Sequence, residues 1–465
     1  MSFAMTTIVR DGRRSDRPTC VLLTNSGIYW PLADYFLCRN LSLSTERGYA
    51  RSIARLMNWT EAKHPNFQAG GPQDSAMFSS FLHDLLYGTI SGGEDASGLW
   101  WSAHSPDVVS RTAGHIAEFS EWLATSGQGL AINRKERPES AFERMVALKA
   151  FTHRKNASLL AHVKNSSAAN LFAATARQVT PPGRTDKLLM APPAFPEHKI
   201  EELLWVGFEN KKFKNDPRPW KRWNLRDILI TLICLYGGAR VSEPMHLWIQ
   251  DTTESDRDPE SCRVFIHEPD HGKITADDPI MGRRTMTRSD YLNQLCDGKV
   301  PLTRATGNSR SGWKGGLLNA PEKRAMEMMW IDADAGRLFK SIWQLYIQHV
   351  RPFSHNMPWA FLTKNGLPMG PSAYMDSLQR AVKKIGLSFR KSEGSTPHGL
   401  RHRYGQWLND RGVNQKVGQV CMHHANPLSQ EVYRQVTAEQ VAHEMDTAPI
   451  RINMPRIPSE VLCLA

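Results

Sequence analysis

Apolar residues recur at helical spacing in three stretches near the start of this 465-residue chain. The first begins after Thr45, and the others lie near 75–88 and 107–124. Polar and Gly-rich segments separate them, so each helix would pack through one apolar side. We therefore expect a small all-helical domain over residues 41–130, preceded by an irregular arm at 1–40.

The pattern changes in the second half of the chain. Residues 224–236 are nearly all apolar and end at a Gly-Gly pair, which predicts a helix buried on most sides, and a second helix is expected at 240–248. The apolar runs 263–267 and 326–331 predict two paired strands, separated by a long, polar, Gly-rich insertion at 268–325. Helices dominate the rest. The predicted fold class is mainly α with a small antiparallel β-sheet.

Proline-rich sequence separates the two parts. It includes Pro181-Pro182 and Pro192-Pro193, and we assign 131–196 to a linker with connecting helices. The second domain is predicted over 197–449, and a tail follows at 450–465.

Composition narrows the class of protein. Hydrophobic residues make up 41% of the chain and charged residues 22%, as in a globular protein rather than a disordered one. The net charge of +12, from 58 basic and 46 acidic residues, suits a polyanionic partner, although other basic proteins share such an excess.

The 7 cysteines are scattered without a CxxC pair, and no apolar stretch is long enough to span a bilayer. These features predict reduced thiols and a cytoplasmic protein without a membrane segment.

Thr396-Pro397 is a favourable start for a helix, because threonine caps well and proline is tolerated at the first position. His398 and Arg401 then lie three apart in the first turn, where free backbone N–H groups add affinity for an anion. In isolation the same residues also fit a capped surface helix with solvated side chains.

Arg240 follows the Gly-Gly pair, and Glu243 can hold its guanidinium in place. Such a pair is commonly just solvated, so it becomes informative only together with a second arginine. Two arginines can clamp both non-bridging oxygens of one phosphate.

His423-His424 and then Tyr433 follow downstream. A tyrosine at this place can equally be a core residue, and Cys421 with the two histidines could suggest a metal. No second Cys/His pair at zinc spacing accompanies them, so we expect no metal and no cofactor.

In order and spacing, these residues resemble the C-terminal signature of the tyrosine recombinase (phage integrase) family: Arg240-x-x-Glu243, His398-x-x-Arg401, His424 and Tyr433. The resemblance covers residues 197–445, and the segment 41–130 resembles the family's helical, SAM-like core-binding domain. The layout, with its long insertion, looks most like integrase-like recombinases of bacterial mobile elements. The family commonly has Gly-His in place of His423-His424, so the spacing to Tyr433 selects His424 as the functional histidine.

The resemblance implies an enzyme that cleaves and rejoins DNA through a 3′-phosphotyrosine, without metal or ATP. Tyr433 would be the nucleophile, and His398 would assist removal of its proton. Arg240 and Arg401 would stabilise the charge on phosphorus, and His424 would donate a further hydrogen bond.

The family's catalytic lysine normally lies in a short β-hairpin turn, which in this chain is greatly enlarged. Lys314, Lys273 and Lys323 are all candidates for the group that protonates the departing 5′ oxygen. Lys314 is favoured, because it lies between Trp313 and glycines ahead of the second strand.

The densest run of basic and aromatic residues predicts a DNA contact by Lys211, Lys212, Lys214, Lys221 and Arg222, although a solvated face is the default for such a run. The resemblance implies double-stranded DNA and further copies of the chain as partners, in a tetramer on paired sites, within the bacterial cytoplasm at the nucleoid. A type IB topoisomerase-like relaxase and a non-catalytic DNA-binding protein on the same fold are the alternatives.

Overall fold

The computed structural model describes residues 5–10, 18–39, 41–66, 74–133, 135–136, 145, 176–177, 179, 181, 192–279, 281–354 and 356–425. The chain divides into two compact units, Met1–Lys187 and Leu188–Ala465. Tyr433, the predicted tail at 450–465 and most of the predicted connection at 131–196 lie outside the described residues.

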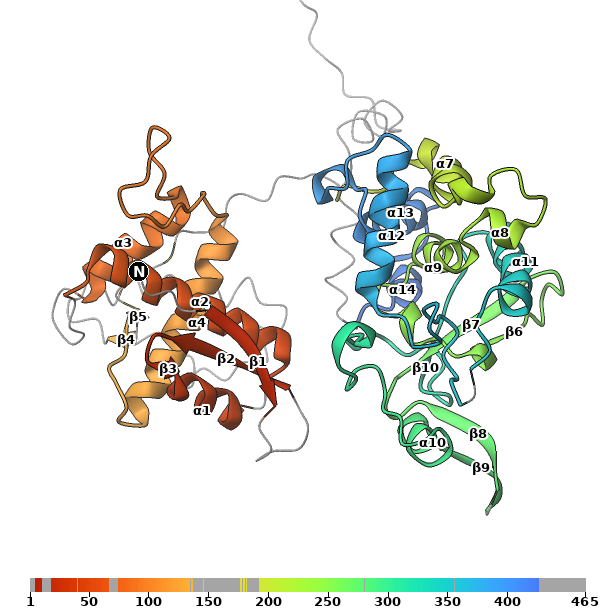
Figure 1. Cartoon of the computed structure of the whole chain (residues 1–465), viewed down its shortest axis with the longest axis horizontal. Coiled ribbons are helices and arrows are strands. Elements are labelled where there is room, and N and C mark those ends of the chain that lie inside the picture. The colour runs from red at the N-terminus through yellow and green to blue at the C-terminus, as the bar shows by residue number, and fades with distance from the viewer. Residues whose placement is uncertain are drawn as a thin grey trace, which may run out of the picture. The chain divides into compact units, whose positions relative to one another are not determined.

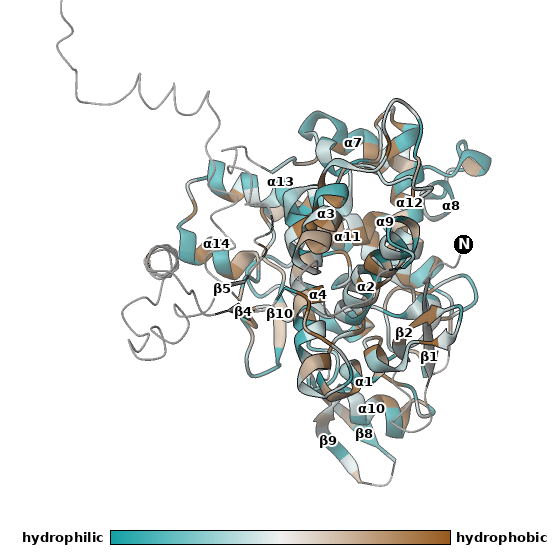
Figure 2. Ribbon diagram, turned by 90° about the vertical axis from the view of Figure 1, so that its left-hand side faces the viewer, coloured by the Kyte–Doolittle hydropathy of each residue, from teal (hydrophilic) through white to brown (hydrophobic). Residues whose placement is uncertain are grey.

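Helices make up most of the described part of the first unit (Figure 1): α1 (Trp30–Arg39), α2 (Leu43–Lys63), α3 (Asp74–Tyr87) and α4 (Pro106–Thr125). The three expected apolar stretches correspond to α2, α3 and α4. Helix α2 begins earlier than expected, because the Ser42 hydroxyl accepts the Thr45 N–H at 3.2 Å. Figure 2 shows hydrophobic and hydrophilic residues alternating along the helices, as expected where a helix buries one side.

The expectation of an irregular arm at residues 1–40 is wrong for the described residues. Strands β1 (Met5–Arg10), β2 (Pro18–Thr24) and β3 (Gly27–Ile28) form an antiparallel sheet in the order β1-β2-β3, and α1 follows. The Cys20 N–H of β2 donates to the Glu46 carboxylate of α2 at 3.0 Å, which ties the sheet to the helices. A short pair, β4 (Lys135–Glu136) with β5 (Ala176–Arg177), is also described.

The second unit contains the helices α7 (Ile200–Glu202), α8 (Pro219–Arg222), α9 (Leu225–Tyr236), α10 (Arg288–Leu295), α11 (Ala333–His349), α12 (Pro371–Lys384), α13 (Pro397–Asp410) and α14 (Gln415–Cys421). The Asn224 side chain caps α9, whose residues from Ile228 to Leu235 are completely buried. Helix α9 packs against α11, α12 and α13 (Figure 1). Helix α9 is therefore buried on most sides, as its nearly all-apolar sequence predicts.

The two strands expected in the second unit form and pair, but the second, expected over 326–331, covers only Ala325–Glu327. Strands β6 (Thr252–Glu254), β7 (Cys262–His267) and β10 (Ala325–Glu327) form an antiparallel sheet in the order β10-β7-β6. Inside the insertion lie the hairpin of β8 (Lys273–Asp278) and β9 (Gly282–Thr287) and then α10, together at one end of the unit (Figure 1). The predicted fold class, mainly helical with small antiparallel sheets, is confirmed.

The helix expected at 240–248 does not form. The backbone there makes a turn followed by a single 3-10 turn, Pro244–His246. Pro244 has no N–H to donate, and the Glu243 carboxylate accepts the N–H of Arg240. These two residues favour a turn over a helix at this place.

Candidate active site

Arg240 lies in a tight turn directly after helix α9. Gly238 has a φ of +70°, and a Cβ at this position would lie 2.5 Å from the Tyr404 ring, so the turn requires glycine. The Arg240 N–H donates to Glu243 Oε2 at 2.7 Å, and Nη1 of its guanidinium donates to Oε1 at 2.8 Å. The side chain of Glu243 is 3% exposed and that of Arg240 21%. A buried carboxylate thus fixes a guanidinium that still reaches the surface.

Arg401 connects the Arg240 turn with the end of α14. It lies in the first half of α13, which begins after Thr396 as predicted, and it is only 1% exposed. Its Nη1 donates to the carbonyl of Gly238 and its Nη2 to the carbonyl of Met422. One guanidinium therefore joins two segments that are far apart in the sequence. His398, one turn earlier in α13, is exposed.

The His423-His424 pair forms a turn directly after α14. His423 has a φ of +52°, in the left-handed region that favours glycine. Its buried ring forms a hydrogen bond between Nε2 and the Glu327 carbonyl at 3.0 Å. His424 is 5% exposed, and its backbone carbonyl accepts from Gln419 Nε2 at 2.8 Å. Glycine would adopt this backbone at the first position of the pair without the strain that a side chain adds.

Both histidines of this turn are neutral near pH 7. Burial, followed by the charges of Arg401 and Arg240, lowers the pKa of His424 to about 3. Burial also lowers the pKa of His423 to about 4. A neutral imidazole can still donate a hydrogen bond from its protonated nitrogen.

The three candidate lysines lie in different surroundings. Lys314 is exposed on a loop, residues 311–317, whose ends are hydrogen-bonded to Ser242 and His423. Lys323 Nζ lies 3.8 Å from the centre of the Phe265 ring. Lys273 begins β8, and its N–H donates to the Lys323 carbonyl at 3.2 Å.

The pKa of His398 shows which charges surround it. Loss of solvation lowers this pKa first, followed by the positive charges of Arg401, Lys314, Lys391 and Arg240. Both predicted arginines and Lys314 are thus among the charges that lower the pKa of His398, whereas Lys273 and Lys323 are not. Lys391 was missed, because no motif in the sequence marks it.

The predicted DNA-binding run forms a cluster around one aromatic ring. Lys212 and Lys221 lie 5.6 and 6.0 Å from the centre of the Phe213 ring. Lys211, Lys212 and Lys214 are exposed, whereas Arg222 is half-buried and its Nε lies 3.2 Å from a Glu209 carboxylate oxygen. The lysines are therefore accessible, and the arginine is already engaged.

A second basic surface, in the first unit, was not predicted. Arg47, Arg51 and Arg55 follow one another at intervals of four along α2, and Arg47 and Arg51 are exposed. Partial burial and then the charge of Arg51 lower the pKa of Arg55, so these side chains are close together. Exposed Arg111 lies on α4, which packs against α2. The interval of four in the sequence was the available signal.

Two features tied to other classes of protein were searched for among the described residues. Every described helix is too short or too polar to cross a membrane. The described residues also contain no group of three histidine, cysteine, aspartate or glutamate side chains that could hold a metal ion.

Residues 338–440 match the model of the phage integrase family. This segment contains His398, Arg401, His424 and Tyr433, and Arg240 and Lys314 precede it. Over residues 338–440 the chain is therefore similar to the phage integrase family, and the resemblance inferred from the motifs is confirmed for this segment. The family consists of enzymes that break and rejoin DNA, so the predicted class of enzyme is confirmed as well.

Solved structures of three DNA recombinases and integrases are similar to the chain at low identity. The Tn1549 transposon integrase in complex with transposon right end DNA has 15% identity and a TM-score of 0.45, covering 90% of this chain and 97% of that one. The XerH recombinase bound to its difH substrate has 12% identity and a TM-score of 0.45, covering 88% and 81%. A lambda integrase dimer bound to a COC′ core site has 11% identity and a TM-score of 0.40, covering 87% and 76%. No curated protein sequence matches the chain. The family assignment therefore depends on the match of residues 338–440.

Proposed function

We propose that this protein is a site-specific DNA recombinase that cleaves one strand with Tyr433 and rejoins it through a 3′-phosphotyrosine intermediate. The observation that carries this proposal is the pair of hydrogen bonds made by Arg401. Its guanidinium joins the carbonyls of Gly238 and Met422, so the turn of Arg240 and the turn of His424 meet at one place. The positive charges of both arginines and of Lys314 also act on His398, which supports a phosphate site among these residues.

The cleavage step needs a base, because a phenol with a pKa of about 10 is largely protonated at neutral pH. The phenolic oxygen of Tyr433 attacks phosphorus, and its proton passes to His398. The lowered pKa of His398 leaves its imidazole neutral and able to accept that proton. The bond between phosphorus and the 5′ oxygen breaks, and its electron pair stays on that oxygen, which takes a proton from Lys314.

Charge on phosphorus rises during this step. Arg240, which reaches the surface, would donate to a non-bridging oxygen, and buried Arg401 would stabilise the developing charge through its own positive charge. His424 would donate from a neutral ring. Guanidinium groups in these positions can do the work of a metal ion. The phosphotyrosine conserves the energy of the phosphodiester, so a 5′-hydroxyl can reverse the step without ATP. We therefore propose a reaction that is independent of metal and ATP.

We propose duplex DNA as the partner. The exposed cluster of Lys211, Lys212 and Lys214 and the stripe of arginines on α2 are two basic surfaces in separate units. Contacts of this kind bind phosphates and position a protein on DNA without reading its sequence. Exchange between two duplexes further requires several copies of the chain, and we propose a tetramer on paired sites. Sedimentation of the protein with one-site and two-site DNA tests this stoichiometry.

A nicked suicide substrate, which loses a short fragment after cleavage, tests the chemistry. Wild-type protein is expected to form a covalent adduct with DNA that survives denaturation, and Tyr433→Phe is expected to form none. Tyr87→Phe is the matched control, since Tyr87 is an exposed tyrosine of the first unit. An adduct with Tyr433→Phe, or none with wild type, would contradict the proposal.

A further inference from the structure

We propose that Ser311 and Trp313, together with His246, are positioning residues that hold Lys314 where it can protonate the departing 5′ oxygen. This inference rests on the proposed function and adds to it the means by which a lysine in a large insertion reaches the site. The loop that carries Lys314 is held at its beginning, its middle and its end, and each contact involves a different part of the second unit.

The beginning of the loop is fixed to the Arg240 turn. Ser311 is completely buried, and its hydroxyl donates to the carbonyl of Ser242 at 2.9 Å. Its backbone N–H donates to the carbonyl of Leu302 at 3.0 Å. Since Ser242 lies two residues after Arg240, one short hydrogen bond sets where the loop starts relative to that guanidinium.

The middle of the loop packs against a buried histidine. The rings of Trp313 and His246 meet edge to face, with centres 5.6 Å apart and planes at 86°. His246 Nε2 also lies 3.4 Å from the Gly312 carbonyl. Burial lowers the pKa of His246 to about 4, so its ring is uncharged where it meets the indole. Trp313 is thereby held on one side of the backbone that carries Lys314.

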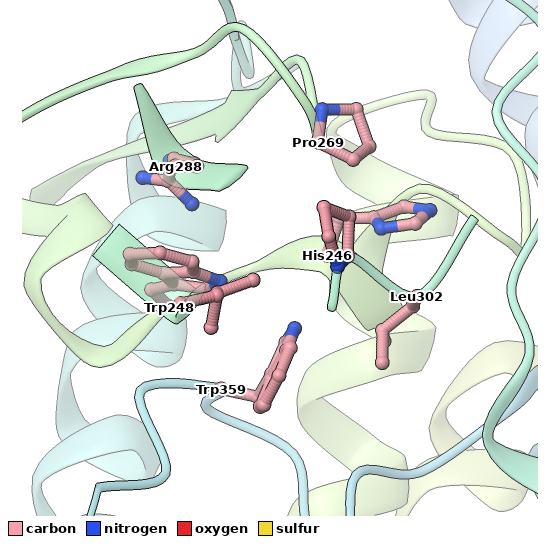
Figure 3. Close-up of a pocket in the computed structure, with 8 residues that line it drawn as sticks. His246, Trp248, Pro269, Arg288, Leu302 and Trp359 are labelled. Atoms are coloured by element: carbon pink, nitrogen blue, oxygen red, sulfur yellow. The ribbon is translucent and has the colours of Figure 1, made fainter. Parts of the chain in front are cut away.

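His246 is itself fixed by the base of the insertion. It lines a small pocket, of about 10 Å³, together with Trp248, Arg288 and Trp359 (Figure 3). Arg288 lies over the Trp248 ring, 4.1 Å from its centre. The surface against which Trp313 packs is therefore part of a largely buried group of side chains.

The end of the loop is fixed to the His423-His424 turn. The Leu317 N–H donates to the His423 carbonyl at 3.3 Å. A Cβ at Gly316 would lie 3.0 Å from that same carbonyl oxygen and from Met326 Sδ, so glycine permits the close approach. Lys314 thus lies at the centre of a short loop whose two ends are bonded to the Arg240 turn and to the turn of His424.

Position matters here because a general acid contributes only when it reaches the leaving oxygen. A displacement of about 1 Å can cost on the order of 10²-fold in rate. The lysine itself is expected to contribute about 10²–10⁴-fold as a general acid. Loss of one of the contacts of the loop should therefore slow cleavage less than loss of Lys314, but through the same step.

A substrate with sulfur in place of the bridging 5′ oxygen separates this role from others. A thiol has a pKa of roughly 8.5, so a thiolate leaves without being protonated, whereas an alkoxide requires an acid. Single-turnover cleavage of matched oxygen and sulfur suicide substrates is measured for Ser311→Ala, Trp313→Ala and His246→Ala, beside Lys314→Ala and Arg240→Ala. Ser309→Ala is the matched control, because its hydroxyl donates to the Pro368 carbonyl at 2.8 Å, away from the catalytic turns.

We expect Ser311→Ala and Trp313→Ala to slow cleavage of the oxygen substrate about 10- to 100-fold and to cleave the sulfur substrate at close to the wild-type rate. Lys314→Ala should likewise be slow on the oxygen substrate and close to the wild-type rate on the sulfur substrate. Arg240→Ala should cleave both substrates slowly. Ser309→Ala should cleave both at close to the wild-type rate. Equal loss on both substrates by the Ser311 and Trp313 variants, or lack of rescue of Lys314→Ala, overturns the inference. Absence of any adduct with wild type on either substrate instead overturns the proposed function. The melting temperature of each variant shows whether a loss on both substrates comes from unfolding.

Discussion

At the scale of single residues, the two arginines of the site differ in how much of the fold depends on them. Arg401 is buried and donates to the carbonyls of Gly238 and Met422, whereas Arg240 is partly exposed and pairs with Glu243. A lysine in place of Arg401 has one charged group and cannot reach both carbonyls. We expect Arg401→Lys to lower the free energy of unfolding by about 1–3 kcal/mol, because one buried carbonyl is left unpaired. Urea denaturation should show a smaller decrease in the free energy of unfolding for Arg240→Lys than for Arg401→Lys. An equal or larger decrease would contradict the structural role of Arg401.

His423 gives a second prediction at this scale, because its φ is +52°. A side chain in this region costs about 1–2 kcal/mol compared with glycine. Both His423→Gly and His423→Ala lose the ring and its hydrogen bond to Glu327, so both should be less stable than wild type. Only the alanine variant retains the strain, so His423→Gly should melt above His423→Ala. At an ordinary φ the order would be reversed, since glycine has the greater freedom when unfolded. Thermal denaturation of the two variants measures which of them has the higher melting temperature.

At the scale of elements, a buried ion pair holds the insertion on the second unit. Arg288, at the start of α10, is 1% exposed and pairs with Asp251, which also accepts the Trp248 N–H at 2.8 Å. Arg288→Met should destabilise the protein by about 3–5 kcal/mol, because it leaves an uncompensated buried carboxylate. Adding Asp251→Asn should recover much of the loss. Hydrogen exchange in β8 and β9 should rise in the single variant and fall back in the double one; unchanged exchange in the single variant would show that other contacts hold the hairpin.

Elements with a local signal could be predicted from the sequence. Helix α13 begins at Thr396-Pro397 as expected, and the apolar residues of α9 are buried as expected. The helix expected after Arg240 failed because Glu243 accepts the N–H of Arg240, a competition that helical spacing does not reveal. The first sheet was missed although Val21 and Leu22 give a short apolar run, because short runs do not distinguish strand from loop. The motifs supplied the candidate site residues, whereas the bond from Ser311 to Ser242 joins residues without any shared pattern.

At the scale of the whole molecule, the charge of +12 should make DNA binding depend strongly on salt. Each phosphate contact adds about 0.9 to the slope of log affinity against log salt, so several contacts give a steep fall. Replacing Lys211, Lys212 and Lys214 with glutamine should reduce that slope. Arg337→Gln is the control, because Arg337 is exposed but already paired with Asp258 at 2.9 Å. Fluorescence anisotropy across a salt series measures both slopes, and a binding constant insensitive to salt would refute the basic surfaces as DNA contacts.

Stability of the second unit should fall as the solution becomes acidic, before most carboxylates are protonated. Burial lowers the pKa of His246 and His423 to about 4 and that of His267 to about 3, from an ordinary value of 6.5. Because each pKa is lower in the folded state, the unfolded chain binds more protons than the folded protein below pH 6.5. The free energy of unfolding therefore decreases as the pH falls from 6.5 toward 4. Each histidine adds about 1.4 kcal/mol per pH unit to the slope of stability against pH within this window. His423→Asn is a suitable comparison, since asparagine tolerates the left-handed backbone and does not titrate. Urea denaturation at pH 7, 6 and 5 should give a shallower slope for this variant than for wild type, and parallel curves would mean that His423 is not buried in its neutral form.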